Sequence, residues 1–337
     1  MAQPTMQQVA DRAGVSLALV SLVMRQAPNV SDYRRQLVLD AAEQLGYRPN
    51  VLARNLASRR TNTIGVVLND IHNPFFAEII DGIQAASDEA DYRVLIGNGK
   101  RSPSGEAEMV ETFLQFRVDG IITAGATMPM STIEAASEST KMVLVGRSSR
   151  SQVVDSVNTD DVTGARLAVE YLVELGHRRI AHIDGGTGAG SEERRRGYSQ
   201  AMTDQGLSAE IVTACGDFTE SGGYHAASEL LNQSSRPTAI FAANDLSAAG
   251  ALDRVENAGL TVPGDVSIVG YDNTALAAMQ HLSLTTVNQP RDEIGRLAVR
   301  FILERLRDER TDSVHHMIAP TLVKRKTSSR LTAGAST

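Results

Sequence analysis

The chain has 337 residues, of which 42% are hydrophobic and 4% aromatic, and it contains no tryptophan. This length allows two or three domains with a sizeable core, and no apolar run approaches the roughly 18 residues of a membrane span. The single cysteine, Cys215, excludes an internal disulfide framework and a cysteine-rich zinc site. In its strand-like run, Cys215 is expected to be a small core residue.

Charge is distributed unevenly along the chain. Residues 1–60 hold eight arginines, no lysine and four acidic residues, which is a net charge of +4. Since the whole chain carries −7, the residues after 60 carry −11. A basic head on an acidic body indicates nucleic acid as a partner of the head, although an ordinary solvated surface gives the same balance.

The apolar stretch "VSLALVSLVM", residues 15–24, has two possible interpretations. A secretory signal peptide needs a small-x-small cleavage site after its apolar run, and the "RQAPNVSDYRR" that follows does not supply one. The alternative is a helix within a helix-turn-helix, with Gly14 at the turn and Ser16 as the N-cap. The second interpretation fits the neighbouring residues better.

Three short amphipathic helices are predicted before residue 48, the third of them capped by Ser31. The residues at helical spacing that are expected to face a shared core are Val9, Ala10, Ala13, Val20, Val23, Met24, Leu37, Val38, Ala41, Ala42 and Leu45. This pattern is typical of a helix-turn-helix DNA-binding domain, and it also occurs in helical bundles without a DNA role.

A predicted short helix in residues 47–60, "YRPNVLARNLASRR", ends at a basic pair before the strand-like "TIGVVL". From there predicted strands and helices alternate as far as "VSIVGYDN", and the alternation restarts once, after "DSVNTDD". The pattern predicts two doubly wound parallel-sheet subdomains. Because ligands of such sheets bind beyond the carboxyl ends of the strands, we expect a ligand cleft between the subdomains.

Polar and aromatic side chains that follow these strands are the candidate ligand contacts. They are Asp70, Asn73, Phe75, Phe76, Arg147, Arg194, Phe218, Asn244 and Asp272. Arginine, asparagine and aspartate beside phenylalanine rings suit a polyol or sugar, through hydrogen bonds to hydroxyls and stacking on the ring. The alternative is that asparagine and aspartate at strand ends only cap turns and helices.

Two stretches faintly resemble nucleotide-binding loops, and neither fits. The glycine-rich loop that contains Gly186, Gly188 and Gly190 is not followed by the acidic residue that a dinucleotide-binding motif has about 20 residues later. Val94 stands where a phosphate loop needs its first glycine. We find no catalytic constellation and no histidine pairing at metal-ligand spacing, so no enzyme activity, metal or cofactor is predicted.

Short motifs occur in a fixed order along nearly the whole chain: "VADRAGVS", "YRPN", "ARNLASRRTNTIGV", "HNPFF", "LGHRRIAHI", "RRRGY", "RPTAIFAANDLSAAGAL", "VPGDVSIVGYDN" and "LTTVNQP". In this order and spacing they resemble the lactose/galactose repressor family of bacterial transcription regulators. The resemblance implies an N-terminal all-α helix-turn-helix DNA-binding domain. It also implies an α/β periplasmic-binding-protein-like core of two doubly wound parallel-sheet subdomains.

The resemblance implies that residues 17–25 lie in the major groove of DNA and that residues 50–58 form a hinge helix in the minor groove. Leu56 matches the position that wedges between central base pairs and kinks the DNA, unless it is a plain linker residue. The DNA contacts implied are Thr5, Ser16, Leu17, Ala18, Ser21, Leu22, Arg25, Asn50, Ala53, Arg54 and Leu56.

One feature departs from the family pattern. Relatives usually carry polar side chains on the exposed face of the second helix, where this chain has Leu17, Ala18 and Leu22. Apolar side chains touch thymine methyl groups and form no hydrogen bonds with a guanine edge. We therefore expect weak direct readout at these bases, with more of the specificity from the DNA bend and from Ser16, Ser21 and Arg25.

The resemblance also implies the domain boundaries. The expected segments are a DNA-binding domain at 1–48, a hinge helix and linker at 49–60 and an effector-binding core at 61–330. The polar composition of the C-terminal "TSSRLTAGAST" predicts a disordered tail at 331–337. Within the core, the first subdomain is expected to take 61–160 and 291–320, and the second 161–290 and 321–330.

The expected partners are double-stranded operator DNA, a second copy of the chain and a small molecule. A cytoplasmic homodimer would bind a palindromic operator and sense a sugar, or else a nucleoside or purine, in its cleft. Phe218 lies where purine-binding relatives also place an aromatic side chain, which keeps the nucleoside alternative open. A secreted or periplasmic sugar-binding protein with no DNA role has the same core, and the hinge motif argues against it.

Overall fold

The computed structural model describes residues 4–24, 27–47 and 60–331. The chain divides into two compact units, Met1–Thr61 and Asn62–Thr337. Within the described residues, no helix is both long enough and apolar enough to span a membrane.

The first unit contains the helices α1 (Met6–Ala13), α2 (Leu17–Met24) and α3 (Asp32–Leu45). Thr5 and Gln8 form a capping box at the start of α1. Gly14 ends that helix with a left-handed φ of 65°, which a glycine adopts without steric cost. Val9, Val20 and Val38 are fully buried between the helices. The predicted helix-turn-helix is confirmed.

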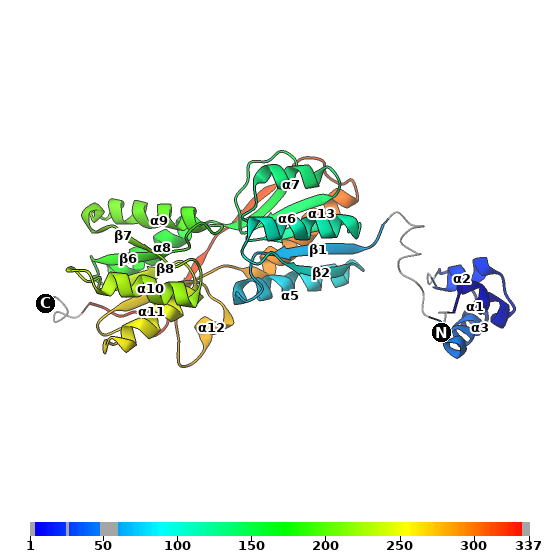
Figure 1. Ribbon diagram of the computed structural model, residues 1–337, viewed down its shortest axis with the longest axis horizontal. Coiled ribbons are helices and arrows are strands. Elements are labelled where there is room, and N and C mark those ends of the chain that lie inside the picture. Colours follow the sequence, from blue (N-terminus) through cyan, green and yellow to red (C-terminus); the bar gives the residue numbers. More distant parts are fainter. Residues whose placement is uncertain (1–3, 25–26, 48–59, 332–337) are drawn as a thin grey trace. The chain divides into compact units, whose positions relative to one another are not determined.

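The second unit begins with a parallel six-stranded sheet, which defines the first subdomain (Figure 1). Its strands, in the order in which they pair, are β11 (His315–Ile318), β5 (Asp155–Thr159), β4 (Lys141–Val145), β3 (Gly120–Ala124), β1 (Thr63–Leu68) and β2 (Arg93–Asn98). The helices packed on it are α5 (Pro74–Glu89), α6 (Pro103–Gln115), α7 (Met130–Ser137) and α13 (Arg291–Leu306). Helices α5 and α13 share one apolar core with the sheet, and α6 and α7 share a second.

A second six-stranded sheet defines the second subdomain. Its strands, in pairing order, are β12 (Thr321–Val323), β10 (Thr285–Asn288), β9 (Ser267–Asp272), β8 (Ala239–Ala242), β6 (Ile180–Asp184) and β7 (Val212–Cys215). All of its pairs are parallel except β12 with β10. The other elements are α8 (Asp161–Glu174), α9 (Ser191–Asp204), the 3₁₀ turn Ser208–Glu210, α10 (Glu220–Leu231), α11 (Asp245–Asn257) and α12 (Ala275–Ala278).

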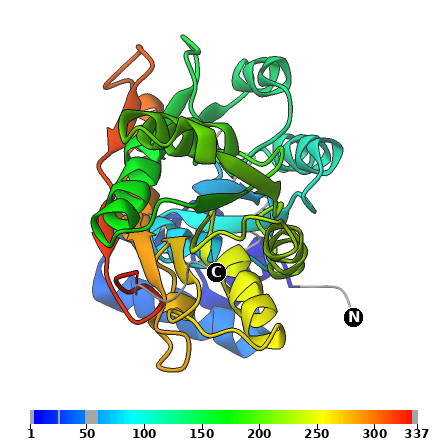
Figure 2. The ribbon, with the colours of Figure 1, turned by 90° about the vertical axis from the view of Figure 1, so that its left-hand side faces the viewer.

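The helices of the second subdomain cover both faces of its sheet. Helices α8 and α9 pack on one face, and α10 and α11 pack on the other. Figure 2 shows this arrangement along the length of the unit, with the green and the yellow helices on opposite sides of the strands. The predicted pair of doubly wound sheets is confirmed.

The chain crosses between the two sheets three times. It leaves the first sheet after β5, returns between β10 and α13, and leaves again between β11 and β12. In each sheet the chain order changes direction beside the first strand, at β1/β3 and at β6/β8. Such switch points are where doubly wound sheets bind ligands, and both sheets therefore offer a binding edge within this unit.

The structure bears on two expectations from the sequence, the burial of Cys215 and the disorder of the C-terminal tail. Cys215 is exposed, because it ends the edge strand β7, so the expectation of a core cysteine is wrong. Leu331 donates its backbone N–H to the carbonyl of Leu175. The remainder of the expected tail, 332–337, lies outside the described residues.

Candidate functional site

The first unit presents one side of α2 to solvent. Leu17 is 45% exposed and Leu22 is 40% exposed, and Ala18 and Ser16 are exposed beside them. The opposite side of the helix carries the buried Val20 and Val23. The face that the sequence analysis assigned to DNA is therefore a solvent-facing and largely apolar surface.

Polar groups flank this face at both helix starts. The Ser16 hydroxyl accepts a hydrogen bond of 3.2 Å from the N–H of Leu19, so it caps α2. Thr5 is exposed and caps α1, and Ser21 is half-buried. The remaining predicted DNA contacts, Arg25, Asn50, Ala53, Arg54 and Leu56, lie outside the described residues.

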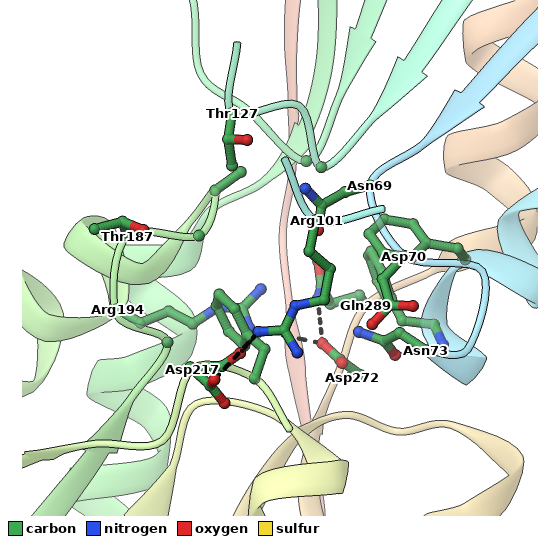
Figure 3. Close-up of a pocket in the computed structure, with 18 of the residues that line it drawn as sticks. Asn69, Asp70, Asn73, Arg101, Thr127, Thr187, Arg194, Asp217, Asp272 and Gln289 are labelled. Atoms are coloured by element: carbon green, nitrogen blue, oxygen red, sulfur yellow. Dashed lines mark hydrogen bonds and ion pairs between the residues drawn. The ribbon is translucent and has the colours of Figure 1, made fainter. Parts of the chain in front are cut away.

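The second unit contains a cavity of about 260 Å³ between its two subdomains. This is close to the small end of the range typical for small-molecule sites. Its walls come from loops that follow β1, β2, β3 and β4 of the first sheet and β6, β7, β9 and β10 of the second. Figure 3 shows the polar side chains of both subdomains converging on this space.

Seven of the nine predicted ligand contacts line the cavity: Asp70, Asn73, Phe75, Phe76, Arg194, Phe218 and Asp272. Asn73 also caps α5, because its Oδ1 accepts a hydrogen bond of 3.0 Å from the N–H of Phe75. Asp70 Oδ1 accepts one of 2.9 Å from the N–H of His72. Asn73 and Asp70 therefore both line the cavity and accept hydrogen bonds from the local backbone.

Arg194 is the most highly constrained charged group of the site. It is 6% exposed, its Nε donates to Asp161 Oδ1 at 2.9 Å, and one terminal nitrogen lies 3.7 Å from Asp272 Oδ1. Its guanidinium also lies 3.9 Å from the centre of the Tyr271 ring. Burial lowers the pKa of Arg194, but the nearby carboxylates outweigh burial and raise that pKa above its ordinary value. Arg194 therefore stays charged.

Asp272 is the buried acid of the site. Burial raises its pKa to about 8, supported by the charge of Asp245 and opposed by Arg194 and by a 2.7 Å hydrogen bond from Gln289 Nε2. Burial also raises the pKa of Asp245 to about 6. With its pKa raised in this way, Asp272 holds its proton near neutral pH and can donate a hydrogen bond to a ligand.

Three phenylalanines supply the apolar part of the walls. The rings of Phe75 and Phe76 meet edge-on with centroids 5.3 Å apart. The Phe218 ring lies so close to Gly185 and Gly188 that an added Cβ would come within 2.1 Å and 2.7 Å of it, respectively. These two glycines are the reason that an aromatic ring can reach the cavity from this loop.

Two of the predicted contacts do not line the cavity. Arg147 donates instead to the carbonyls of Ala126 and Met128 beneath it. Asn244 is 1% exposed, caps α11 and donates its Nδ2 to the carbonyl of Phe218 at 3.0 Å. For Asn244 the capping alternative describes the structure, with the addition that it holds the loop that carries Phe218.

The cavity is also lined by residues that were not among the predicted ligand contacts. The other lining residues are Asn69, Arg101, Pro103, Gly125, Thr127, Gly146, Gly185, Thr187, Gly188, Ala189, Asp217 and Gln289. Arg101 and Gln289 follow β2 and β10, to which the strand-end rule was not applied, whereas Asn69 and Asp217 stand beside Asp70 and Phe218, which the rule did select. Among the residues that the structure describes, no group of His, Cys, Asp and Glu side chains could hold a metal ion.

Comparison with known proteins covers nearly the whole chain. A family model described as bacterial regulatory proteins, lacI family, matches residues 5–50, and a periplasmic binding protein-like domain matches residues 169–328. The HTH-type transcriptional repressor PurR of Erwinia tasmaniensis is 34% identical over 330 residues, which are 96% of this chain and 96% of that protein.

Solved structures agree with the sequence relatives. The lac repressor dimer bound to operator and the anti-inducer ONPF matches with a TM-score of 0.87 at 29% identity, covering 97% of this chain and 100% of that one. The complex of the transcriptional regulator CelR with cellobiose matches with a TM-score of 0.72 at 30% identity, again over 97% and 100%. The chain therefore belongs to the lacI family of bacterial regulatory proteins and is an effector-responsive, DNA-binding regulator of transcription.

Proposed function

We propose that this protein represses transcription by binding a palindromic operator as a homodimer, and that a sugar in the cleft changes its affinity for the operator. The observation that carries the proposal is the cavity of the second unit, whose walls combine Arg194, Asp272 and phenylalanine rings. It lies in the same chain as a helix-turn-helix with a solvent-facing second helix. A relative whose structure matches 97% of this chain, the lac repressor, was solved as a dimer bound to operator and an anti-inducer.

The proposed DNA contacts are those of the exposed α2 face and its flanks. Leu17, Ala18 and Leu22 would touch thymine methyl groups, while Ser16 and Ser21 would donate hydrogen bonds to phosphates or base edges. Residues 49–60, which include Leu56, are proposed as the hinge that bends the DNA at the centre of the operator. In this proposal most of the sequence preference comes from the bend, and less from hydrogen bonds to bases.

A sugar is the proposed effector because of the groups in the cavity. Asp70, Asn73, Asp272 and Arg194 offer hydrogen bonds to hydroxyl groups, and the phenylalanine rings offer apolar faces to a pyranose or furanose. The relative CelR was solved with cellobiose. A nucleoside is the second candidate, because three phenylalanines on one cavity could enclose a planar base.

The protein is proposed to bind its ligand without transforming it and to act in the cytoplasm, where operator DNA lies. The ionisable side chains Arg194 and Asp272 already have partners within the protein: Arg194 is hydrogen-bonded to Asp161, and Asp272 to Gln289. No nucleophile with an adjacent base is evident among the described lining residues.

Selection of bound duplexes from a random DNA library by the purified full-length protein tests this proposal. We expect enrichment of a palindrome with an easily kinked centre, and binding that weakens steeply as salt rises, because phosphate contacts release counterions. No enrichment with or without a panel of sugars and nucleosides would contradict the proposal.

A further inference from the structure

Positive charge at the cavity is limited to two side chains among the described lining residues, Arg101 and Arg194. Which ligands the cavity accepts depends on whether either guanidinium is available to a negatively charged group. The charge of Arg194 is already compensated: its Nε donates to Asp161 at 2.9 Å, one terminal nitrogen donates to the carbonyl of Ala243 at 2.5 Å, and Asp272 lies 3.7 Å away.

Arg101 is held from the opposite side of the cavity. It follows β2 of the first subdomain, whereas Asp217 follows β7 of the second. One terminal nitrogen of Arg101 donates to the Asp217 carbonyl at 2.6 Å and lies 3.4 Å from Asp217 Oδ2. Figure 3 shows Arg101 extending across the space between the subdomains to reach Asp217.

Asp217 is presented by a loop with a fixed shape. Asp217 and Phe218 both have left-handed backbones, with φ of 47° and 62°. Asp217 Oδ1 accepts hydrogen bonds from the N–H and the hydroxyl of Thr219, at 3.3 Å and 2.5 Å, and Asn244 holds the Phe218 carbonyl. Since Oδ1 is used within the loop, Oδ2 is left to face Arg101.

Arg101 is also anchored by its own backbone. Its φ is 56°, and its N–H donates to the carbonyl of Asn69 at 2.8 Å. The backbones of both partners are therefore held in place, although the side chains of Arg101 and Asp217 are 37% and 53% exposed. The neighbouring arginines do not offer an alternative cation to an anionic ligand. Arg195 is paired with Asp184 at 2.9 Å, and Arg147 donates to two backbone carbonyls.

The rest of the wall is acidic or neutral. Asp70 and Asp272 line the cavity together with the amides Asn69, Asn73 and Gln289. An anionic ligand would meet carboxyl groups and two arginines that are already paired, and it would have to displace Asp217 to reach a cation. A hydroxylated neutral ligand would meet hydrogen-bond acceptors and donors without such a cost.

We propose that the Arg101–Asp217 pair is a charge filter across the cleft: it makes the effector site select an uncharged ligand and reject the phosphorylated form of the same ligand. The inference rests on the proposed function, in which this cleft binds the effector, and it narrows the ligand class. Specificity of this kind depends on the unfavourable interaction with the wrong ligand as much as on contacts with the right one.

Asp217→Asn is the variant that tests the filter. Asparagine keeps Oδ1 as an acceptor for Thr219 and tolerates the left-handed backbone, and it removes only the charge beside Arg101. Asp91→Asn is the matched control, because Asp91 is also an exposed aspartate with a left-handed φ, of 59°, and it does not line the cavity. The double variant Arg101→Gln/Asp217→Asn also removes the cation, whose charge the single variant leaves uncompensated.

Calorimetric titration of the full-length proteins with inorganic phosphate, ribose and ribose 5-phosphate gives the readout. For Asp217→Asn we expect phosphate and ribose 5-phosphate to bind about two- to fivefold more tightly than they do to the unaltered protein or to Asp91→Asn, and we expect the double variant to lose this gain. Ribose binding, where present, should change much less than ribose 5-phosphate binding.

Three results would overturn the inference. They are binding of ribose 5-phosphate by the unaltered protein as tight as, or tighter than, its binding of ribose, no gain in a folded Asp217→Asn, or a gain that persists in the double variant. The first needs no variant, so a variant that fails to fold leaves the test intact. Duplex selection, measured separately on the unaltered protein, tests the repressor function and is independent of these outcomes.

Discussion

Asp272 ends β9 with an unusual backbone as well as a buried carboxyl group. Its φ is 105°, in a region that side-chain-bearing residues rarely occupy and that costs about 1–3 kcal/mol. Its Oδ1 accepts from Gln289, and its carbonyl accepts from Arg291, which is bound in turn to Glu78 of the first subdomain. These contacts hold the residue in place, and strain of this kind is concentrated at functional sites.

The raised pKa of Asp272 predicts a pH dependence of stability. The ordinary pKa is 3.8 and the folded one is about 8, so between these values the unfolded chain loses a proton that the folded protein keeps. Rising pH therefore favours unfolding across this window, and the stability contributed below pH 3.8 is lost as pH passes 8.

Replacing Asp272 by asparagine removes this titration. The free energy of unfolding of the unaltered protein, measured by denaturant titration, should fall relative to that of Asp272→Asn as the pH is raised from 5 to 8. Asp91→Asn, which changes an exposed carboxyl group, should follow the unaltered protein. Parallel pH profiles for Asp272→Asn and the unaltered protein would show that Asp272 is not protonated in the folded state.

Substitution of Leu22 tests whether the exposed apolar face of α2 contacts DNA bases. Leu22→Arg places a guanidinium, which can hydrogen-bond to a guanine edge, at a position that is 40% exposed and contributes little to the core. Duplex selection should then yield a changed base preference in each half-site. Leu39→Arg is the control, because Leu39 is 43% exposed on α3 and outside the predicted contact face. An unchanged preference in Leu22→Arg would mean that this position does not face the bases.

At the scale of elements, the turn between α1 and α2 depends on a single glycine. Gly14 has a φ of 65°, and no atom lies within 4 Å of the position that a Cβ would take. A side chain there meets backbone strain without a steric clash, so the cost of Gly14→Ala should be about 1 kcal/mol, and that of Gly14→Asn smaller. The strain would therefore lie in the turn that positions α2 relative to α1.

Hydrogen exchange of the α1 and α2 amides in the full-length protein measures this cost. Gly14→Ala should speed exchange about fivefold, which corresponds to about 1 kcal/mol, and Gly14→Asn should speed it less. Gly206→Ala is the matched control, since Gly206 is also left-handed with open space around it and lies in the second unit. Equal exchange in Gly14→Ala and the unaltered protein would contradict the role given to this turn.

The elements themselves were accessible from sequence because they follow local rules. Helical spacing placed Val9, Val20 and Val38 in the first core, and alternation of strands with helices gave both sheets. Strand ends located most of the cavity wall. Local rules did not separate Asn244, which caps a helix, from Asp272, which lines the cavity, because both residues follow a buried strand.

The cross-cleft contacts were not accessible in the same way. Arg101 and Asp217 are 116 residues apart and meet only because the two sheets bring their carboxyl ends together. Arg147 satisfies two loop carbonyls, which no spacing in the sequence indicates. The fold was thus predictable from periodicity, whereas the pairing of charges at the site depends on distances that only the folded chain provides.

At the scale of the whole molecule, the cavity proposed for the effector is lined by both subdomains, so binding there would depend on how they are arranged. Contacts such as Arg101 with Asp217 and Glu78 with Arg291 join the subdomains, and a change in the cleft would make or break them. A ligand that binds one arrangement more tightly shifts the population toward it. Because operator binding by the dimer would select among the same arrangements, the two binding events should be linked.

Thermodynamic linkage gives the most direct test of this account. Dissociation constants for the selected operator are measured with and without the sugar or nucleoside that stabilises the protein in a thermal-shift screen, and those for the ligand with and without operator. We predict that each ligand changes the affinity of the other by the same factor, about 5- to 150-fold. Operator and ligand affinities that are each unaffected by the other would contradict an effector-responsive repressor.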